Sequence, residues 1–204
     1  SLQYYNRVDY STDIVYKGCR TRVIGNNYDP SRGIVTGRDI LAFTSINLPR
    51  LGILAGGDQV KFFDMLEDRM NLVIDQLLYR FKIQSNKRVK NYPFLMGQGI
   101  WIDSDKLKPD DTIGEVLKHG TLSVGFIGLA ECLKALIGVH HGESKEAQEL
   151  GLRIIGRMRA RMDEESKKTG LNFSLLATPA EGLSGRFVRI DRKKFGKIED
   201  VTDR

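Results

Sequence analysis

A nearly solitary cysteine in a basic, glycine-bearing stretch is the first place in this sequence where chemistry is expected. Cys19 follows Lys17 and Gly18 and precedes Arg20 and Arg22. Neighbouring cations lower the pKa of a thiol and favour the reactive thiolate, and a glycine permits a tight loop tip. A lone cysteine is more often a small buried apolar residue. Both interpretations stand on these residues alone, and the basic flanks favour a reactive thiol.

The other cysteine and the histidines carry weaker signals. Cys132 lies in an apolar helical pattern and is expected to be structural. His119, His140 and His141 lie in glycine-flanked segments and form no recognisable motif with Cys19. With two cysteines and no Cys-x-x-Cys spacing, we expect neither a disulfide framework nor a metal site.

Another chemical feature lies where an apolar strand pattern, residues 171–177, runs directly into a helix pattern. Thr178 suits the N-cap, Pro179 the first helical position, and Glu181 falls three residues after the cap. Free backbone N–H groups and the positive end of a helix dipole at a strand's carboxyl end suit a phosphate. The residues of such a phosphate site are Thr178, Ala180, Glu181 and Gly182. The alternative is a well-capped helix without a ligand, and the sequence contains neither a P-loop nor a dinucleotide fingerprint.

Composition indicates a globular chain with a basic balance. Of its 204 residues 41% are hydrophobic and 28% charged, and the formal net charge is +6. The basic residues are dispersed among acidic ones, so a nucleic-acid partner is not expected, whereas a polyphosphate substrate would suit the charge. Neither a membrane-spanning run nor a signal peptide is recognisable, so we expect a cytoplasmic protein without membrane contact. The first residue is not methionine, which leaves open that this is a piece of a longer chain.

Hydrophobic periodicity alternates between strand and helix patterns, as is typical of α/β folds with a mostly parallel sheet and crossover helices. Strands are expected at residues 13–16, 43–48, 122–128 and 171–177. Helices are expected at residues 58–84, from a capping box at 112–115, at 130–136, and at 144–168.

Five short blocks, taken in order, identify a family resemblance. They are Gly18 to Val23, Gly37-Arg38, Thr44 to Arg50, Gly125 to Glu131, and Ala177 to Glu181. In order and spacing they resemble the catalytic region of class III anaerobic ribonucleoside-triphosphate reductases, which are glycyl radical enzymes. The resemblance implies half of a ten-stranded α/β barrel with a finger loop and long crossover helices. Residues 1–204 would form one catalytic fragment, with the finger loop and flanking strands in 1–50 and the second half-barrel in 51–204.

The same resemblance implies roles and cofactors. Cys19 would be the finger-loop cysteine whose thiyl radical abstracts the ribose 3′ hydrogen during anaerobic reduction of ribonucleoside triphosphates to 2′-deoxyribonucleoside triphosphates. Thr178 to Gly182 would hold substrate phosphate, and Asn47 would contact substrate. A separate S-adenosylmethionine/iron–sulfur activase would form the glycyl radical. The radical and a zinc site would lie in a C-terminal region outside these residues. An N-terminal ATP-sensing domain would also lie outside them. The fragment would bind no cofactor itself and would be inactive alone, and the complete enzyme would be a homodimer.

Two positions depart from formate-using members of that family. Lys17 stands where they have methionine, and Ile40 stands where they have asparagine. An aliphatic side chain cannot hydrogen-bond a carboxylate, so a redoxin or another thiol competes with formate as the expected electron donor. Two other functions remain open at this stage, namely a fragment of another glycyl radical enzyme and a basic nucleotide- or nucleic-acid-binding module without catalysis.

Overall fold

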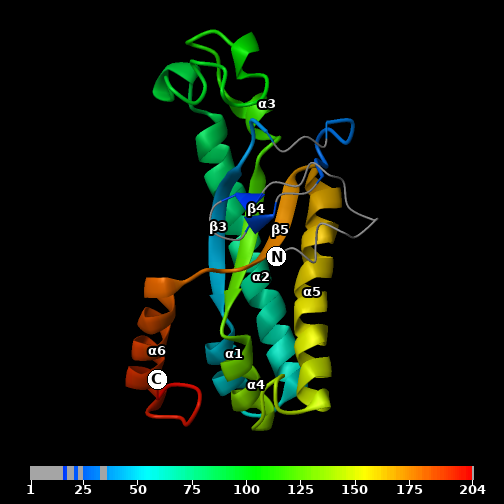
Figure 1. Cartoon of the computed structure of the whole chain (residues 1–204), viewed down its shortest axis with the longest axis vertical. Helices are drawn as coiled ribbons and strands as arrows, with labels where there is room; N and C mark the ends of the chain where they lie inside the picture. Colours follow the sequence, from blue (N-terminus) through cyan, green and yellow to red (C-terminus); the bar gives the residue numbers. More distant parts are fainter. Residues whose placement is uncertain (1–15, 18–20, 23–24, 33–35, 204) are drawn as a thin grey trace. The chain divides into compact units, whose positions relative to one another are not determined.

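The computed structural model describes residues 16–17, 21–22, 25–32 and 36–203 (Figure 1). These residues divide between two compact units. Unit 1 takes its residues from 1–42, 79–122 and 165–173, and unit 2 from 43–78, 123–164 and 174–204. The residues expected to bind phosphate all belong to unit 2.

Two sheets are present among the described residues. The first is an antiparallel ladder of β1 (Tyr16–Lys17) and β2 (Thr21–Arg22), in which Lys17 pairs with Thr21. The second contains three parallel strands in the order β3-β4-β5, with bounds Ile40–Asn47, Thr121–Ile127 and Asn172–Ala177. Each strand of the second sheet is followed along the chain by a helix, which confirms the predicted α/β class.

The helices agree with the periodicity to within two residues at most ends. Their bounds are α1 (Leu48–Ala55), α2 (Gln59–Ser85), α3 (Gly114–Leu117), α4 (Leu129–Ile137), α5 (Lys145–Thr169) and α6 (Glu181–Phe195). The sequence pattern does not predict helix α1, because the apolar strand pattern continues to Leu48. The chain turns one residue earlier, where the Asn47 side chain accepts a hydrogen bond from the Arg50 amide at 3.1 Å and caps the helix.

Apolar stripes explain the long helices of unit 2. Part of α2 buries Phe62, Leu66, Met70, Val73, Ile74 and Leu77, and α5 buries Ala147, Leu150, Ile154, Met158 and Met162. The two helices are also joined on their exposed sides, where Glu67 accepts hydrogen bonds from Arg157 at 2.7 Å and Arg161 at 3.1 Å. Met158 and Met162 are fully buried and fill the core.

Helices α1 and α4 pack closely against each other in unit 2 (Figure 1). A Cβ atom on Gly52 of α1 would lie 2.8 Å from the Cys132 carbonyl oxygen of α4. The glycine therefore permits a backbone approach that a larger residue would prevent. Helix α1 directly follows the carboxyl end of β3, and α4 follows that of β4.

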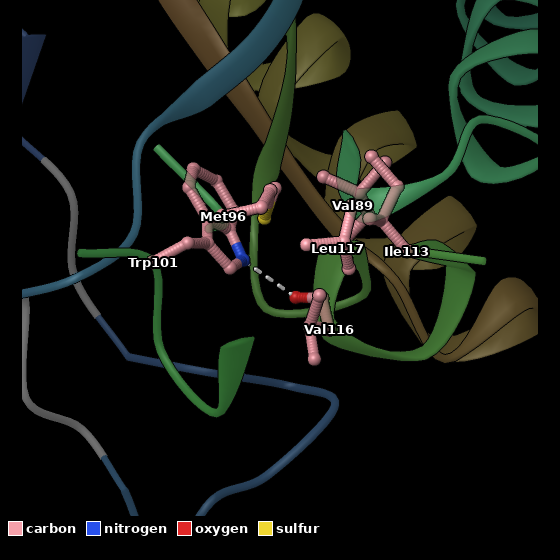
Figure 2. Packing of buried hydrophobic residues seen from close by; sticks show 6 residues of the cluster. All are labelled: Val89, Met96, Trp101, Ile113, Val116 and Leu117. Carbon is pink, nitrogen blue, oxygen red and sulfur yellow. Dashed lines mark hydrogen bonds between the residues drawn. The ribbon is translucent and has the colours of Figure 1, made fainter. Parts of the chain in front are cut away.

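Unit 1 is built around a separate apolar cluster (Figure 2). Its buried members are Val89, Met96, Trp101, Ile113, Val116 and Leu117. The Trp101 indole donates to the Val116 carbonyl at 2.8 Å, so its polar atom is satisfied. The predicted capping box at residues 112–115 is wrong: α3 begins at Gly114 without a side-chain cap, and Thr112 instead forms a β-bridge with Arg88. Two single-turn 3₁₀ helices, Val89–Asn91 and Ser104–Lys106, complete this region.

Within the described part of the chain, no helix is both long and apolar enough to cross a membrane.

Candidate functional site

The carboxyl ends of β3, β4 and β5 bring together polar groups from distant parts of the sequence, all within unit 2. Ser45 lies on β3, Gly125 on β4, and Thr178 directly follows β5. The hydroxyl groups of Ser45 and Thr178 are hydrogen-bonded at 2.7 Å, and the Thr178 amide donates to the Phe126 carbonyl at 3.1 Å. Carboxyl ends of parallel strands are where α/β sheets bind ligands. We call these three residues and the turn at 178–182 the carboxyl-end site.

Gly125 is the residue that allows this hydrogen bond. A Cβ atom at this position would overlap Thr178 Oγ1 and would lie 2.7 Å from Ser45 Oγ. Any side chain on the central strand would therefore separate the two hydroxyls. Sequence reasoning did not select Ser45 or Gly125 as site residues, although a glycine inside a strand pattern is a recognised sign of close approach.

The turn after β5 differs from the prediction. Helix α6 begins at Glu181, and Ala180 occupies the N-cap position without a side-chain cap. Thr178 does not cap the helix, because it lies two residues too early and its hydroxyl is bonded to Ser45. Pro179 therefore precedes the helix instead of opening it. The prediction of a Thr178 cap is wrong. The prediction of a phosphate site does not depend on that cap, because it rests on the backbone N–H groups of the turn.

The first turn of α6 has the features of an anion site. The initial N–H groups of a helix have no partner within the helix, and no side-chain cap occupies them here. Gly182 is exposed, and a Cβ atom on it would meet nothing within 4 Å. Because Glu181 is itself acidic, an anion would be recognised through backbone N–H groups and the helix dipole.

Asn47 has two hydrogen-bonding partners of its own. Its side-chain oxygen caps α1, and its amide nitrogen donates to Asp191 Oδ2 at 2.7 Å. Arg50 reaches the other oxygen of the same carboxylate, with Nε and Nη2 each 2.6 Å from Asp191 Oδ1. Sequence reasoning missed Asp191, because this carboxylate stands in a run of basic residues on α6 and its partners lie more than 140 positions away.

A hollow of about 300 Å³ adjoins these groups in unit 2. Its polar lining is Ser45, Asn47, Arg50 and Arg69, and Phe187 contributes an aromatic ring. The carboxyl-end site therefore lies beside a space that a small molecule can enter.

The other predicted site residues are the radical residue Cys19 and the two reductant-pocket residues Lys17 and Ile40. Cys19 lies outside the described residues, in the connection 18–20 between β1 and β2. Lys17 is the last residue of β1. Ile40 opens β3 in unit 1, where it lines a pocket of about 430 Å³ with largely apolar walls that include Trp101 and Met96.

Cys132 is fully buried on α4, which confirms its structural interpretation. Burial raises the pKa of its thiol to about 12. A thiol in this environment is inert as a nucleophile.

The three histidines do not form one cluster. His119 is buried in unit 1, where its Nδ1 lies 2.9 Å from the Asn26 amide nitrogen. His140 and His141 contact each other edge to face in unit 2, with ring centroids 5.8 Å apart. Across the described residues, no group of three or more histidine, cysteine, aspartate or glutamate side chains is arranged to hold a metal ion.

Comparisons with known proteins agree on one family. The family model described as anaerobic ribonucleoside-triphosphate reductase matches residues 2–204. The chain is 34% identical over 190 residues to the anaerobic ribonucleoside-triphosphate reductase of Salmonella typhimurium, covering 92% of this chain and 26% of the relative. It is 32% identical over 193 residues to that of Enterobacteria phage T4, covering 92% of this chain and 30% of the relative.

A solved structure shows the same fold. The anaerobic ribonucleotide reductase from Thermotoga maritima, with citrate in the active site, has a TM-score of 0.60 at 19% sequence identity. The match covers 81% of this chain and 28% of that structure. The described fold therefore corresponds to part of a barrel-type reductase domain, as predicted. The chain spans about a quarter of the length of the curated relatives it matches.

Proposed function

Because this chain belongs to the anaerobic ribonucleoside-triphosphate reductase family, we propose that it is part of the catalytic region of an enzyme that converts ribonucleoside triphosphates to 2′-deoxyribonucleoside triphosphates. The family match over residues 2–204 is the observation that carries this proposal. The finger loop and flanking strands would occupy residues 1–50, and residues 51–204 would belong to the second half-barrel. By themselves these residues are expected to be inactive.

Cys19 is the proposed thiyl radical residue. Oxidation of its thiol by loss of a hydrogen atom to a glycyl radical, held outside these residues, would generate the thiyl radical. This radical would take the ribose 3′ hydrogen, the 2′ hydroxyl would gain a proton and leave as water, a reductant would supply two electrons and a second proton, and the Cys19 thiol would return the hydrogen atom to C3′. The contrast with Cys132 supports the choice, because the Cys132 thiol is buried and has a raised pKa. Lys17, two residues before Cys19, is the last residue of β1, and it pairs with Thr21 at the start of β2. Cys19 therefore lies in the sequence between two paired strands.

The carboxyl-end site is the proposed site for substrate phosphate. Thr178, Ala180, Glu181 and Gly182 form a turn whose helix presents uncapped N–H groups, and the backbone at Gly182 is open. Ser45 fixes the start of this turn through Thr178. Asn47 lines the adjoining hollow and is proposed to face the substrate from the side of β3.

A thiol is the proposed electron donor. Lys17 and Ile40 replace the methionine and asparagine of formate-using relatives, and Ile40 belongs to the lining of a largely apolar pocket. The Ile40 side chain offers formate no hydrogen-bond donor where those relatives have an amide. If labelled formate transfers its hydrogen to product during turnover of the complete enzyme, this part of the proposal is wrong.

The remaining parts of the proposal concern the complete enzyme. A separate S-adenosylmethionine/iron–sulfur activase would generate the glycyl radical, and a zinc site would lie in the C-terminal region. The relevant assembly would be a cytoplasmic homodimer. Nucleic acid has no proposed role.

Replacing each cysteine in the complete enzyme tests the central assignment. Cys19→Ser is expected to retain the fold and to abolish deoxyribonucleotide formation, because a hydroxyl does not replace the thiol in hydrogen-atom transfer. Cys132→Ala is the control and should retain nucleotide reduction, since that thiol is inert. Unchanged reduction by Cys19→Ser would refute the assignment.

A further inference from the structure

Helix α6 is held in an unusual way. The one buried residue among its 15 is Asp191, which is 2% exposed. Leu183, Phe187 and Val188, on the same side of the helix, are only half-buried, and a buried carboxylate is costly unless it is paired. The orientation of α6 therefore depends strongly on the partners of Asp191.

Those partners lie at the beginning of α1. Asn47 donates to Asp191 Oδ2 at 2.7 Å, and Arg50 donates to Oδ1 through both Nε and Nη2 at 2.6 Å. Both carboxylate oxygens are thus engaged, one of them by a forked guanidinium. We call Asn47, Arg50 and Asp191 the Asp191 latch.

The other end of α6 is fixed to the sheet. Thr178 precedes the helix and is bonded to the Phe126 carbonyl and to the Ser45 hydroxyl. From Glu181 to Asp191 the helix rises about 15 Å, at 1.5 Å per residue. Hydrogen bonds therefore hold helix α6 near both of its ends, at Thr178 before its first turn and at Asp191 near its last turn.

Packing between these attachments is incomplete. A cavity of about 130 Å³ lies along α6 and is lined by Asn47, Pro49, Ser184, Phe187 and Asp191, among others. Close-packed side chains would resist a tilt of the helix, whereas a cavity allows one. The latch is then the contact that sets the angle of α6.

We propose that Asp191 is a positioning residue for the substrate phosphates, acting through Arg50 and Asn47. By fixing the angle of α6 it aims the N–H groups of the first turn at the phosphate. This inference rests on the proposed function. It also gives Asn47 a positioning role in addition to its place in the lining of the hollow.

Asp191→Asn in the complete reductase is the primary test. The amide keeps the size of the side chain but loses the charge, and it replaces one acceptor oxygen with an NH2 donor that faces groups that are themselves donors. We expect the KM for a ribonucleoside triphosphate to rise about tenfold while kcat at saturation stays within about twofold, since misaligned groups weaken phosphate binding. Asp64→Asn, the same change at an exposed position on α2 of unit 2, should alter neither value. An unchanged KM in Asp191→Asn would overturn the proposal.

A second variant separates positioning from stability. The double substitution Arg50→Met/Asp191→Leu replaces the ion pair with apolar side chains, an exchange that commonly preserves or increases stability. If the latch positions phosphate, this variant folds and still has the raised KM. A return of the KM to its wild-type value would show that the latch serves stability alone and would overturn the proposal.

A third variant tests the phosphate turn itself. Gly182→Asp adds a carboxylate where a Cβ atom meets nothing within 4 Å, so it should fold and should raise the KM by repelling phosphate. If Gly182→Asp leaves the KM unchanged, the assignment of the phosphate turn fails, and the positioning role of Asp191 fails with it. If Gly182→Asp raises the KM and Asp191→Asn does not, the phosphate turn stands and the latch alone is refuted.

Discussion

Replacing Gly125 with alanine should damage both the stability of the sheet and the binding of substrate. The new Cβ atom would overlap Thr178 Oγ1 and would lie 2.7 Å from Ser45 Oγ, whereas ordinary van der Waals contact begins at 3.4 Å. To reach ordinary contact Ser45 Oγ must move away from the central strand by about 0.7 Å (3.4 minus 2.7), and Thr178 Oγ1, which would lie closer, must move farther. The 2.7 Å hydrogen bond between Ser45 and Thr178 cannot survive that movement.

Three terms set the magnitude. Loss of a neutral hydrogen bond costs about 1 kcal/mol, and forcing an extra carbon into a packed site costs about 1–3 kcal/mol. The reduced entropy of the unfolded chain returns about 0.4–1 kcal/mol. Gly125→Ala should therefore lower the free energy of unfolding by about 1–3 kcal/mol. Because Thr178 begins the phosphate turn, its displacement should also raise the KM for ribonucleoside triphosphate at least about tenfold.

Urea unfolding and steady-state kinetics of the complete enzyme measure the two effects. Gly156→Ala is the matched control, because a Cβ atom at this position of α5 meets nothing within 4 Å. That variant should gain about 0.5–1 kcal/mol and keep its KM. The double variant Gly125→Ala/Thr178→Ala removes the closest clash, so its loss of stability should be smaller than the sum of the single losses. If Gly125→Ala matches Gly156→Ala in both stability and KM, the glycine does not make room for the Ser45–Thr178 contact.

Three further results are expected. At pH 8 a maleimide should leave Cys132 unmodified in the folded protein, since a pKa of about 12 leaves roughly one thiol in ten thousand ionised, and mass spectrometry after labelling would detect an error. Burial and the Arg32 guanidinium lower the pKa of His119, although Asp103 and Asp29 act in the opposite direction. The unfolded state therefore takes up a proton more readily than the folded state. The contribution of His119 to the free energy of unfolding is complete above the unfolded-state pKa of about 6.5 and is lost as pH falls below it. A His119→Gln variant should show a flatter decline between pH 7 and pH 5 in urea unfolding, and an identical slope would contradict this. Glu67→Gln should cost less than about 1 kcal/mol, with the loss disappearing in 1 M salt, because the ion pairs it removes are partly exposed.

Local periodicity was enough to predict the long helices and the strands that lead into the site. The stripe on α2 and the stripe on α5 follow the helical repeat over many turns, so single irregularities do not obscure them. Short elements were harder. Helix α1 has only eight residues, and its cap depends on the single side chain of Asn47 at the end of a strand. The capping box at residues 112–115 had suitable residue types, yet Thr112 was engaged in a β-bridge with Arg88.

Contacts between distant residues account for most of what the sequence did not reveal about the site. Asp191 pairs with Arg50 across 141 positions, and Ser45 meets Thr178 across 133. No periodicity or motif marks such pairs, because they depend on the order of strands in the sheet. The strand-to-helix pattern located the turn at residues 178–182 and the family resemblance supported it, but neither gave a reason to examine Asp191.

The failed prediction of a Thr178 cap bears directly on the proposed phosphate site. A capping hydroxyl would have bonded the N–H groups of the first turn of α6 and left fewer of them for a ligand. Because Gly125 has no side chain, Thr178 can reach Ser45 instead, and α6 begins two residues later without a side-chain cap. The helix thereby forgoes the stability of a cap, about 1 kcal/mol, and keeps its N–H groups available. At the proposed phosphate site the local capping rule and ligand binding conflict, because a side chain that capped the helix would occupy the N–H groups that a bound phosphate requires.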